Sequence, residues 1–234
     1  MGQLINITLP DGRVVQPADW TTAEGLYTTV EFGTASFTQL AGFSYGINGT
    51  VQGSPTNRQA TLADTNLQGE GGILPPNEAM LVRSIAVEMY AIPGTGLVMS
   101  DADNVIAPEI GLRNMLRIQR DLVLEFSIAA VKKYLVVPIS WCAAGSGPDS
   151  GTTGGVGTTA TAGYLAGNNG GTGIQDQRQL ASPLFIQGGE TFRVSIVAPT
   201  GSVSGLAFTG AGANSDARIR VRIHLLGDHK RPVS

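Results

Sequence analysis

The chain has 234 residues, a formal net charge of -3, a charged fraction of 14% and 32 glycines. This length buries a proper core, so one β-sandwich or barrel domain is expected. Because neutralising many phosphates needs a local excess of cations, the net charge argues against a chain that wraps nucleic acid. Twelve arginines against three lysines, on a surface poor in charge, favour a protein rich in interfaces.

The lone Cys142 excludes an intramolecular disulfide and a thiolate metal cluster, and we expect it to be a buried apolar side chain. The chain shows neither a basic segment followed by an apolar run at its start nor the ~20 apolar residues of a membrane helix. An unsecreted protein that does not span a membrane is predicted. The glycosylation sequons at Asn6 and Asn48 are then chance matches, and Asn48-Gly49 indicates a tight hairpin turn.

Residues 1–57 predict an N-terminal arm or a set of outer strands. Short β-prone runs there are separated by turn signals, and they cover residues 4–9, 13–15, 26–32 and 36–45. Residues 53–78 carry Gly, Pro, Asn and Gln with little periodicity, which predicts a long ordered loop.

Apolar and polar residues alternate in the rest of the chain over residues 80–92, 122–128, 134–141, 190–197 and 218–225, which we predict to be strands. Pro108 opens a stretch of helical spacing that predicts a short helix between Asn104 and Arg120. Lys132-Lys133 predicts a turn. Residues 143–173 are dominated by Gly, Thr, Ser, Ala and Asn, so only a neighbouring surface is expected to order them.

Strands with one apolar face, separated by long insertions and not alternating with helices, predict an all-β, antiparallel jelly-roll sandwich with one short helix. A single barrel over residues 58–234, preceded by the arm at 1–57, is favoured. A compact double barrel is the alternative, although no internal repeat supports it.

The motifs give little support to an enzyme. Gly42-Phe43-Ser44-Tyr45-Gly46 has the spacing of a nucleophile elbow, but the residues after it predict a turn instead of a helix. The only histidines, His224 and His229, are expected at the surface or at an interface. Acidic residues are too scattered for a metal site, and the glycine motifs that cradle phosphate are missing. We predict no catalytic residue, no cofactor and no metal ion.

Arg218, Arg220 and Arg222 lie on one face of the last predicted strand, and Lys230 and Arg231 extend the positive charge toward the C-terminus. Three partners are open for this group: water, carboxylates of a neighbouring subunit, and nucleic acid or lipid head groups. A subunit interface is the functional hypothesis for these five residues.

Three stretches of the C-terminal two thirds resemble the jelly-roll capsid proteins of tailless icosahedral bacteriophages, particularly those with an internal membrane. They are residues 58–67 leading through Ile73-Leu74-Pro75 into the strand at 81–92, residues 182–186 with the strand at 190–197, and residues 218–225 running into 227–233.

The resemblance implies a barrel of two four-stranded sheets, whose copies assemble as trimeric or higher capsomers in the capsid of a virion. It also implies contacts with other virion proteins and no small-molecule substrate, and it leaves contact with the internal membrane or the genome open. A jelly-roll carbohydrate-binding or virion attachment module is the alternative function. Trp20, Tyr27, Tyr45 and Trp141 are the aromatic candidates for a sugar site, and core packing explains them equally well.

Overall fold

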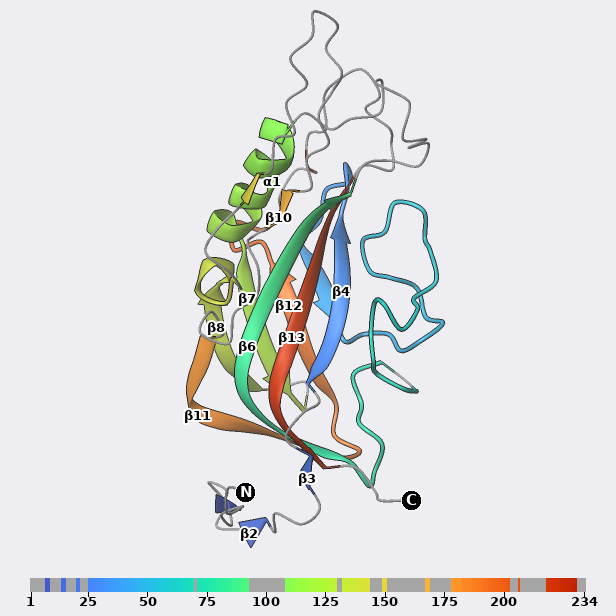
Figure 1. The fold of residues 1–234 in the computed structure, drawn as a ribbon, viewed down its shortest axis with the longest axis vertical. Helices are drawn as coiled ribbons and strands as arrows, with labels where there is room; N and C mark the ends of the chain where they lie inside the picture. The colour runs from blue at the N-terminus through green and yellow to red at the C-terminus, as the bar shows by residue number, and fades with distance from the viewer. Residues whose placement is uncertain are drawn as a thin grey trace, which may run out of the picture.

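The structure is a computed structural model, and its described residues fold into two β-sheets packed face to face, with one α-helix (Figure 1). This arrangement confirms the expected all-β sandwich of antiparallel strands with one short helix. The described residues are 7–8, 14–15, 20–21, 25–69, 71–92, 108–129, 132–143, 149–150, 167–168, 178–202, 206 and 218–230.

The first sheet is built on four long antiparallel strands. In spatial order they are β4 (Leu26–Phe32), β13 (Arg218–Lys230), β6 (Ala79–Ile92) and β11 (Arg178–Gln187). Short strands extend this sheet: β3 (Trp20–Thr21) pairs with β13, and β10 (Gly167–Asn168) pairs with both β6 and β9 (Asp149–Ser150). A separate two-stranded sheet contains β1 (Ile7–Thr8) and β2 (Val14–Val15).

The second sheet contains four antiparallel strands. In spatial order they are β5 (Gln39–Gly42), β12 (Phe192–Val197), β7 (Val123–Ile128) and β8 (Lys132–Pro138). The helix α1 (Pro108–Asp121) immediately precedes β7, as Pro108 at a first helical turn predicts, and the 3-10 helix η3 (Ile139–Trp141) follows β8.

Period-two alternation on both sheets produces the core. On β13, Ile219, Val221, Ile223 and Leu225 are fully buried, while Arg220 and the other residues between them face outward. The inward side chains of the second sheet meet them in one continuous cluster, to which β7 and β12 contribute Leu124, Phe126, Ile128, Phe192, Val194 and Ile196. Burial of this cluster, at about 25 cal/mol per Å² of apolar surface, holds the two sheets together.

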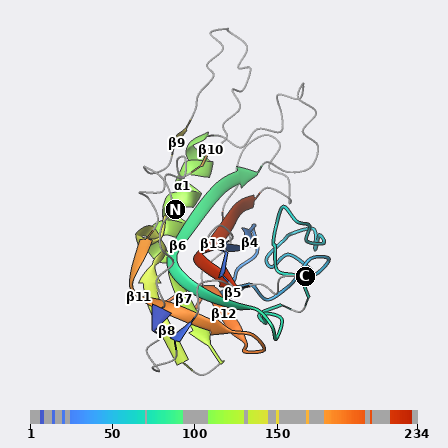
Figure 2. The same cartoon turned by 60° about the horizontal axis from the view of Figure 1, so that its bottom comes forward.

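Residues 43–78 connect the two sheets, and the part that contains Arg58 and Ala63 lies beside β4 and β13, on the outside of the first sheet (Figure 2). Only isolated bridges occur in this segment, such as the one between Thr50 and Gln59, which agrees with the long ordered loop predicted at 53–78. A tight turn is present one residue earlier than the predicted hairpin turn: Gly49 donates its N–H to the carbonyl of Gly46 at 3.0 Å, and Asn48 adopts a φ of 72°. No pair of strands among the described residues flanks this turn, so it is not a hairpin.

The structure corrects the predicted secondary structure at three places. Lys132-Lys133 is not a turn, because these residues start β8 and pair with Ile128 and Ser127 of β7. The strand predicted at 134–141 ends at Pro138, after which the chain forms η3. The strand β11 was not predicted, because Ser182-Pro183 interrupts its alternation at the place where its register against β6 shifts.

The last strand is five residues longer than the alternation at 218–225 indicates. A register shift between Leu226 and Gly227 lets β13 continue along β6 as far as Lys230. A Cβ atom at position 227 would lie 1.9 Å from the carbonyl oxygen of Leu81, so this irregularity requires glycine.

The boundary predicted between residues 57 and 58 falls inside the connection from β5 to β6. Both β4 and β5 precede it, and each pairs with a central strand of one sheet. Apart from Ala143, β9 and β10, the glycine-rich segment 143–173 lies outside the described residues. No helix among the described residues has the length and apolar character needed to span a membrane.

Candidate functional site: the arginine face of β13

The predicted arginines Arg218, Arg220 and Arg222 come together on the outward face of β13, near the centre of the first sheet. Their side chains point outward because the residues that alternate with them fill the core. Arg220 lies between Glu31 of β4 and Tyr90 of β6 in the strand register, and Arg222 lies between Thr29 and Glu88. Side chains directly opposite each other on neighbouring antiparallel strands are about 5 Å apart and interact.

Glu31 is the centre of this face and is completely shielded from solvent, with 0% of its side chain exposed. Its Oε1 receives the Nη2 groups of Arg58 at 2.7 Å and of Arg220 at 3.0 Å, and its Oε2 lies 3.0 Å from Nε of Arg218. Burial raises the pKa of Glu31, but the hydrogen bond from Arg58 and the charges of the three arginines outweigh it and lower the pKa below its ordinary value. Glu31 is therefore a buried carboxylate held by three guanidinium groups.

Arg58 attaches the loop at 43–78 to this cluster. It binds Asp64 through two parallel hydrogen bonds, from Nη1 to Oδ2 at 2.7 Å and from Nη2 to Oδ1 at 2.6 Å. Burial raises the pKa of Asp64, but Arg58 and the N–H and hydroxyl groups of Thr61 outweigh it and lower that pKa to about 2. The same carboxylates raise the pKa of the Arg58 guanidinium. One arginine thus joins a carboxylate of the loop to a carboxylate of the sheet.

Arg222 makes a second contact between the sheet and the loop. Its Nη2 donates to the carbonyl of Ala63 at 2.6 Å, and its guanidinium carbon lies 5.6 Å from the ring centre of Tyr27 and 5.9 Å from that of Tyr90. On its other side Glu88 accepts hydrogen bonds from Tyr90 and lies 3.3 Å from Nε2 of His224. The nearby His224 lowers the pKa of Glu88 to about 2, against an opposing contribution from burial.

The other two predicted residues do not belong to this cluster. Lys230 ends β13, eight residues beyond Arg222, which at ~3.3 Å per residue places it about 26 Å away along the strand. Arg231 lies outside the described residues. The three central arginines therefore have carboxylate partners within their own chain, and the subunit interface predicted for the five residues stays a prediction.

Sequence reasoning missed Glu31, Arg58 and Asp64, which supply most of this network. The available signals were weak: one acidic residue in the β-branched strand at 26–32, and an arginine six residues before an aspartate in a polar loop. Neither signal says that the two segments meet, because strand register and loop docking are properties of the fold.

The residues considered for catalysis each contact a different group and do not meet in one site. The hydroxyl of Ser44 donates to the carbonyl of Ala41 at 2.7 Å, and the segment after it forms turns, as expected. Glu88 lies beside His224, and Nε2 of His229 lies 3.1 Å from Glu78. No group of three metal-ligating side chains occurs within the part of the chain that the structure describes.

The aromatic residues considered for a sugar site are dispersed. Tyr45 is buried and donates its hydroxyl to the carbonyl of Thr29, and the hydroxyl of Tyr27 donates to the carbonyl of Leu62. Trp141 is exposed, and the guanidinium of Arg178 lies 4.8 Å above its ring. The side chain of Trp20 lies outside the described part. These positions do not form one aromatic platform.

Comparison of the chain with protein-family models, with curated proteins and with solved structures finds no match. The order of the strands and the chemistry of the two outer faces are therefore the basis for assigning a function.

Proposed function

We propose that the chain is a jelly-roll capsid protein, which assembles with copies of itself into the icosahedral shell of a bacteriophage. The observation that carries this proposal is the order of the eight long strands in the two sheets. In a jelly roll, an antiparallel ribbon is wrapped so that the first strand pairs with the eighth, the second with the seventh, the third with the sixth and the fourth with the fifth.

The eight strands in chain order are β4, β5, β6, β7, β8, β11, β12 and β13. The four pairs β4–β13, β5–β12, β6–β11 and β7–β8 are all present and all antiparallel. Two further pairings, β13–β6 and β12–β7, complete sheets of four. This nested order supports a jelly roll, and eight strands in two sheets of four support a single barrel over a double one.

The stretches that resemble phage capsid proteins include all or part of four of these strands, and residues 182–186 lie in β11. Residues 81–92 lie in β6, residues 190–197 include β12, and residues 218–225 lie in β13. β6 and β13 are neighbours at the centre of the first sheet, and β12 is central in the second. The resemblance thus concerns the framework of the sandwich, and it supports the capsid proposal through the strands that build the core.

The edge strand β8 offers a surface for self-association. Five large apolar side chains are exposed in the described part of the chain, and three of them lie on β8 and η3: Tyr134 at 44%, Val136 at 53% and Trp141 at 56%. Aromatic side chains and arginines are enriched at the cores of protein interfaces, and Arg178 beside Trp141 fits that composition. Since an exposed apolar edge strand is a template for pairing, we place the contact between copies at β8.

The test compares assembly of the wild-type protein with that of Val136→Asp and Leu62→Asp. We expect the wild type to form trimers or larger assemblies at high concentration in analytical ultracentrifugation and negative-stain electron microscopy. Val136→Asp is expected to shift the protein toward monomer, whereas Leu62→Asp, at a 63% exposed position on the opposite side, is the matched control and is expected to assemble normally. A wild-type protein that stays monomeric at every salt and divalent-ion concentration contradicts the proposal.

A further inference from the structure

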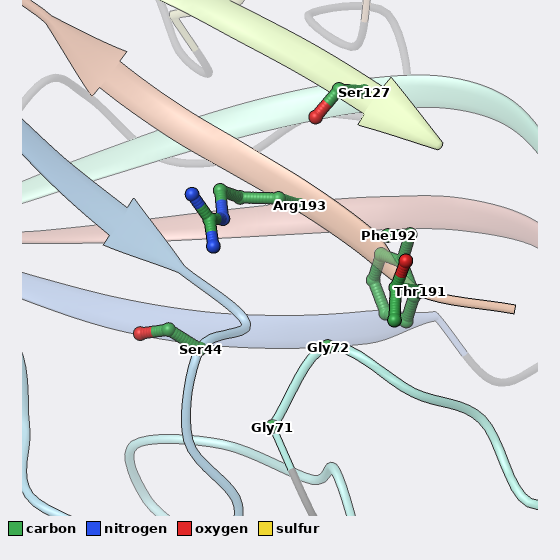
Figure 3. Close-up of a pocket in the computed structure, with 7 residues that line it drawn as sticks. All are labelled: Ser44, Gly71, Gly72, Ser127, Thr191, Phe192 and Arg193. Carbon is green, nitrogen blue, oxygen red and sulfur yellow. The ribbon is translucent and has the colours of Figure 1, made fainter. Parts of the chain in front are cut away.

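The outer face of the second sheet carries a pocket of about 220 Å³, on the side of the sandwich away from the arginine face (Figure 3). Its polar side chains are Ser44, Ser127, Thr191 and Arg193, and the backbone of Gly71 and Gly72 forms one wall. Three separate segments meet here: the start of the loop after β5, the glycine pair farther along that loop, and the adjacent strands β7 and β12.

Among the described residues that line this pocket Arg193 is the only cation, and no described residue neutralises its charge. The other arginines on described strands have partners: Arg83 pairs with Asp228, Arg178 lies over Trp141, and the three of β13 contact glutamates. No ion pair or hydrogen bond joins the Arg193 guanidinium to another described residue. Glu125, the carboxylate two pairs further along the register and on the same face, is held by Lys133 at 2.8 Å.

Two residues with hydroxyl groups lie on the same face of the sheet as Arg193. Ser127 lies directly across from Arg193 in the register of β7 and β12, where opposite side chains are about 5 Å apart. Thr191 precedes Arg193 by two residues and so lies on the same face, about 7 Å along the chain. Neither hydroxyl forms a hydrogen bond with another described residue, so both can turn their hydrogens into the pocket.

The glycine wall is fixed in place before any ligand binds. A Cβ atom on Gly71 would lie 2.0 Å from the backbone carbon of Ser44, and Gly72 has a φ of +75°, so neither position accepts a larger residue without rearrangement. The carbonyl of Gly72 also receives the N–H of Phe192 at 2.7 Å, which ties this wall to β12. The described residues that line the pocket therefore supply donor groups, and none of them is a carboxylate.

We propose that this pocket binds a tetrahedral oxyanion of the phosphate and sulfate class, with Arg193 as the charged ligand and Ser127 and Thr191 as hydroxyl donors. A guanidinium fork matches two oxygens of such an ion, and charge-assisted hydrogen bonds are the stronger kind. One cation in a small pocket, with no carboxylate partner among the described residues, suits a single anionic group. A groove for a nucleic-acid backbone needs several cations along its length. This site does not depend on shell assembly, since it lies within one chain.

The test is isothermal titration of the full-length protein with inorganic phosphate, sulfate and glycerol phosphate, at an ionic strength held constant with chloride so that screening is equal in every arm. Saturable binding of at least one of these ions in the millimolar range is expected. Tighter binding of inorganic phosphate identifies a free ion as the ligand, and tighter binding of glycerol phosphate identifies a phosphate group on a larger molecule. Acetate, whose carboxylate is planar, is the comparison anion and is expected to bind more weakly than the tetrahedral ions.

Three variants assign the binding to this pocket. Arg193→Gln is expected to weaken phosphate binding by about tenfold or more, because it removes the positive charge. Thr191→Val is expected to weaken it by about fivefold, because a hydrogen bond to a charged group is stronger than one between neutral groups. The matched control is Arg120→Gln, an exposed arginine in the last turn of α1, before the start of β7, which is expected to bind like the wild type. Circular dichroism and thermal melting confirm that each variant folds.

Three results would overturn the proposal. The wild type does not bind phosphate, sulfate or glycerol phosphate up to tens of millimolar; or Arg193→Gln binds them as tightly as the wild type does; or acetate binds as tightly as phosphate. Each result is distinct from a failure of the capsid proposal, because a monomeric protein keeps this pocket.

Discussion

Replacing Glu31 with glutamine tests whether the ion cluster on the first sheet stabilises the fold. The cluster of Glu31, Asp64, Arg58, Arg218 and Arg220 carries two negative and three positive charges, and Glu31→Gln removes the carboxylate that all three arginines contact. Arg218 is the most buried of the three arginines, with 9% of its side chain exposed. Little water can therefore replace the carboxylate that this guanidinium loses. Removing one partner of a buried ion pair costs about 3 to 5 kcal/mol.

A loss of that size is a large part of the ~5 to 15 kcal/mol that stabilises a typical domain. Urea denaturation measures it directly, and a chain of this length also loses about 2 to 4 °C of melting temperature per kcal/mol. The control is Glu125→Gln, which breaks the exposed pair with Lys133 and is expected to cost about 0 to 1 kcal/mol. If both variants lose the same small amount, the cluster does not stabilise the fold.

Glu31→Gln also tests how residues 43–78 are held. Arg58 then keeps Asp64 but loses its contact with the sheet, so faster amide hydrogen exchange is expected in this loop, with little change in β7 and β12. Equal amide exchange rates of residues 43–78 in the wild type and in Glu31→Gln would show that the loop docks through other contacts.

Two further properties follow from the titration behaviour of buried groups. The pKa values of Asp64 and Glu88 are lowered from 3.8 and 4.5 to about 2, so each contributes on the order of 2 to 3 kcal/mol that is complete above about pH 5 and is lost as the pH falls toward 2. Denaturation at successive pH steps is expected to show that loss, and a flat profile down to about pH 2 would contradict it. Cys142 is buried, and burial raises the pKa of its thiol to about 11. We expect a thiol reagent at neutral pH to modify it only after unfolding, and rapid labelling of the native protein would disprove its burial.

Where the alternation of apolar residues was strong, the sequence predicted the fold closely. The strand at 26–32 coincides with β4, and the alternation at 80–92 and 122–128 places β6 and β7 to within a residue. On β7 every second side chain fills the core, so its pattern follows directly from burial, whereas β4 is buried on both faces. β11 has no such pattern: most of its side chains are exposed or half-buried, and it contains a proline. It is a strand because β6 provides a partner, which one sequence segment does not reveal.

The site could be predicted only in part, for a similar reason. The arginines at every second position of β13 were visible in the sequence, and so was their common face. Their partners were not visible, since Glu31 is 189 positions away from Arg220 in the chain and reaches it only through the pairing of β4 with β13. The pocket with Arg193 was not visible either. Its other polar lining residues are Ser44, Ser127 and Thr191, which come together only when β7, β12 and the glycine pair meet in the fold.

The two outer faces of the sandwich use charge in opposite ways, and this difference indicates where partners bind. On the first sheet, the docked loop supplies Arg58 and Asp64, and the buried Glu31 neutralises arginines that would otherwise attract a neighbour. A charge already paired and shielded contributes little to association, since a partner would have to displace an existing ion pair to use it. On the second sheet, Arg193 has no carboxylate partner among the described residues, and the edge strand β8 keeps Val136 exposed. Binding energy is still available on this second face, so it is there that both an anion and a second copy of the chain are expected to bind.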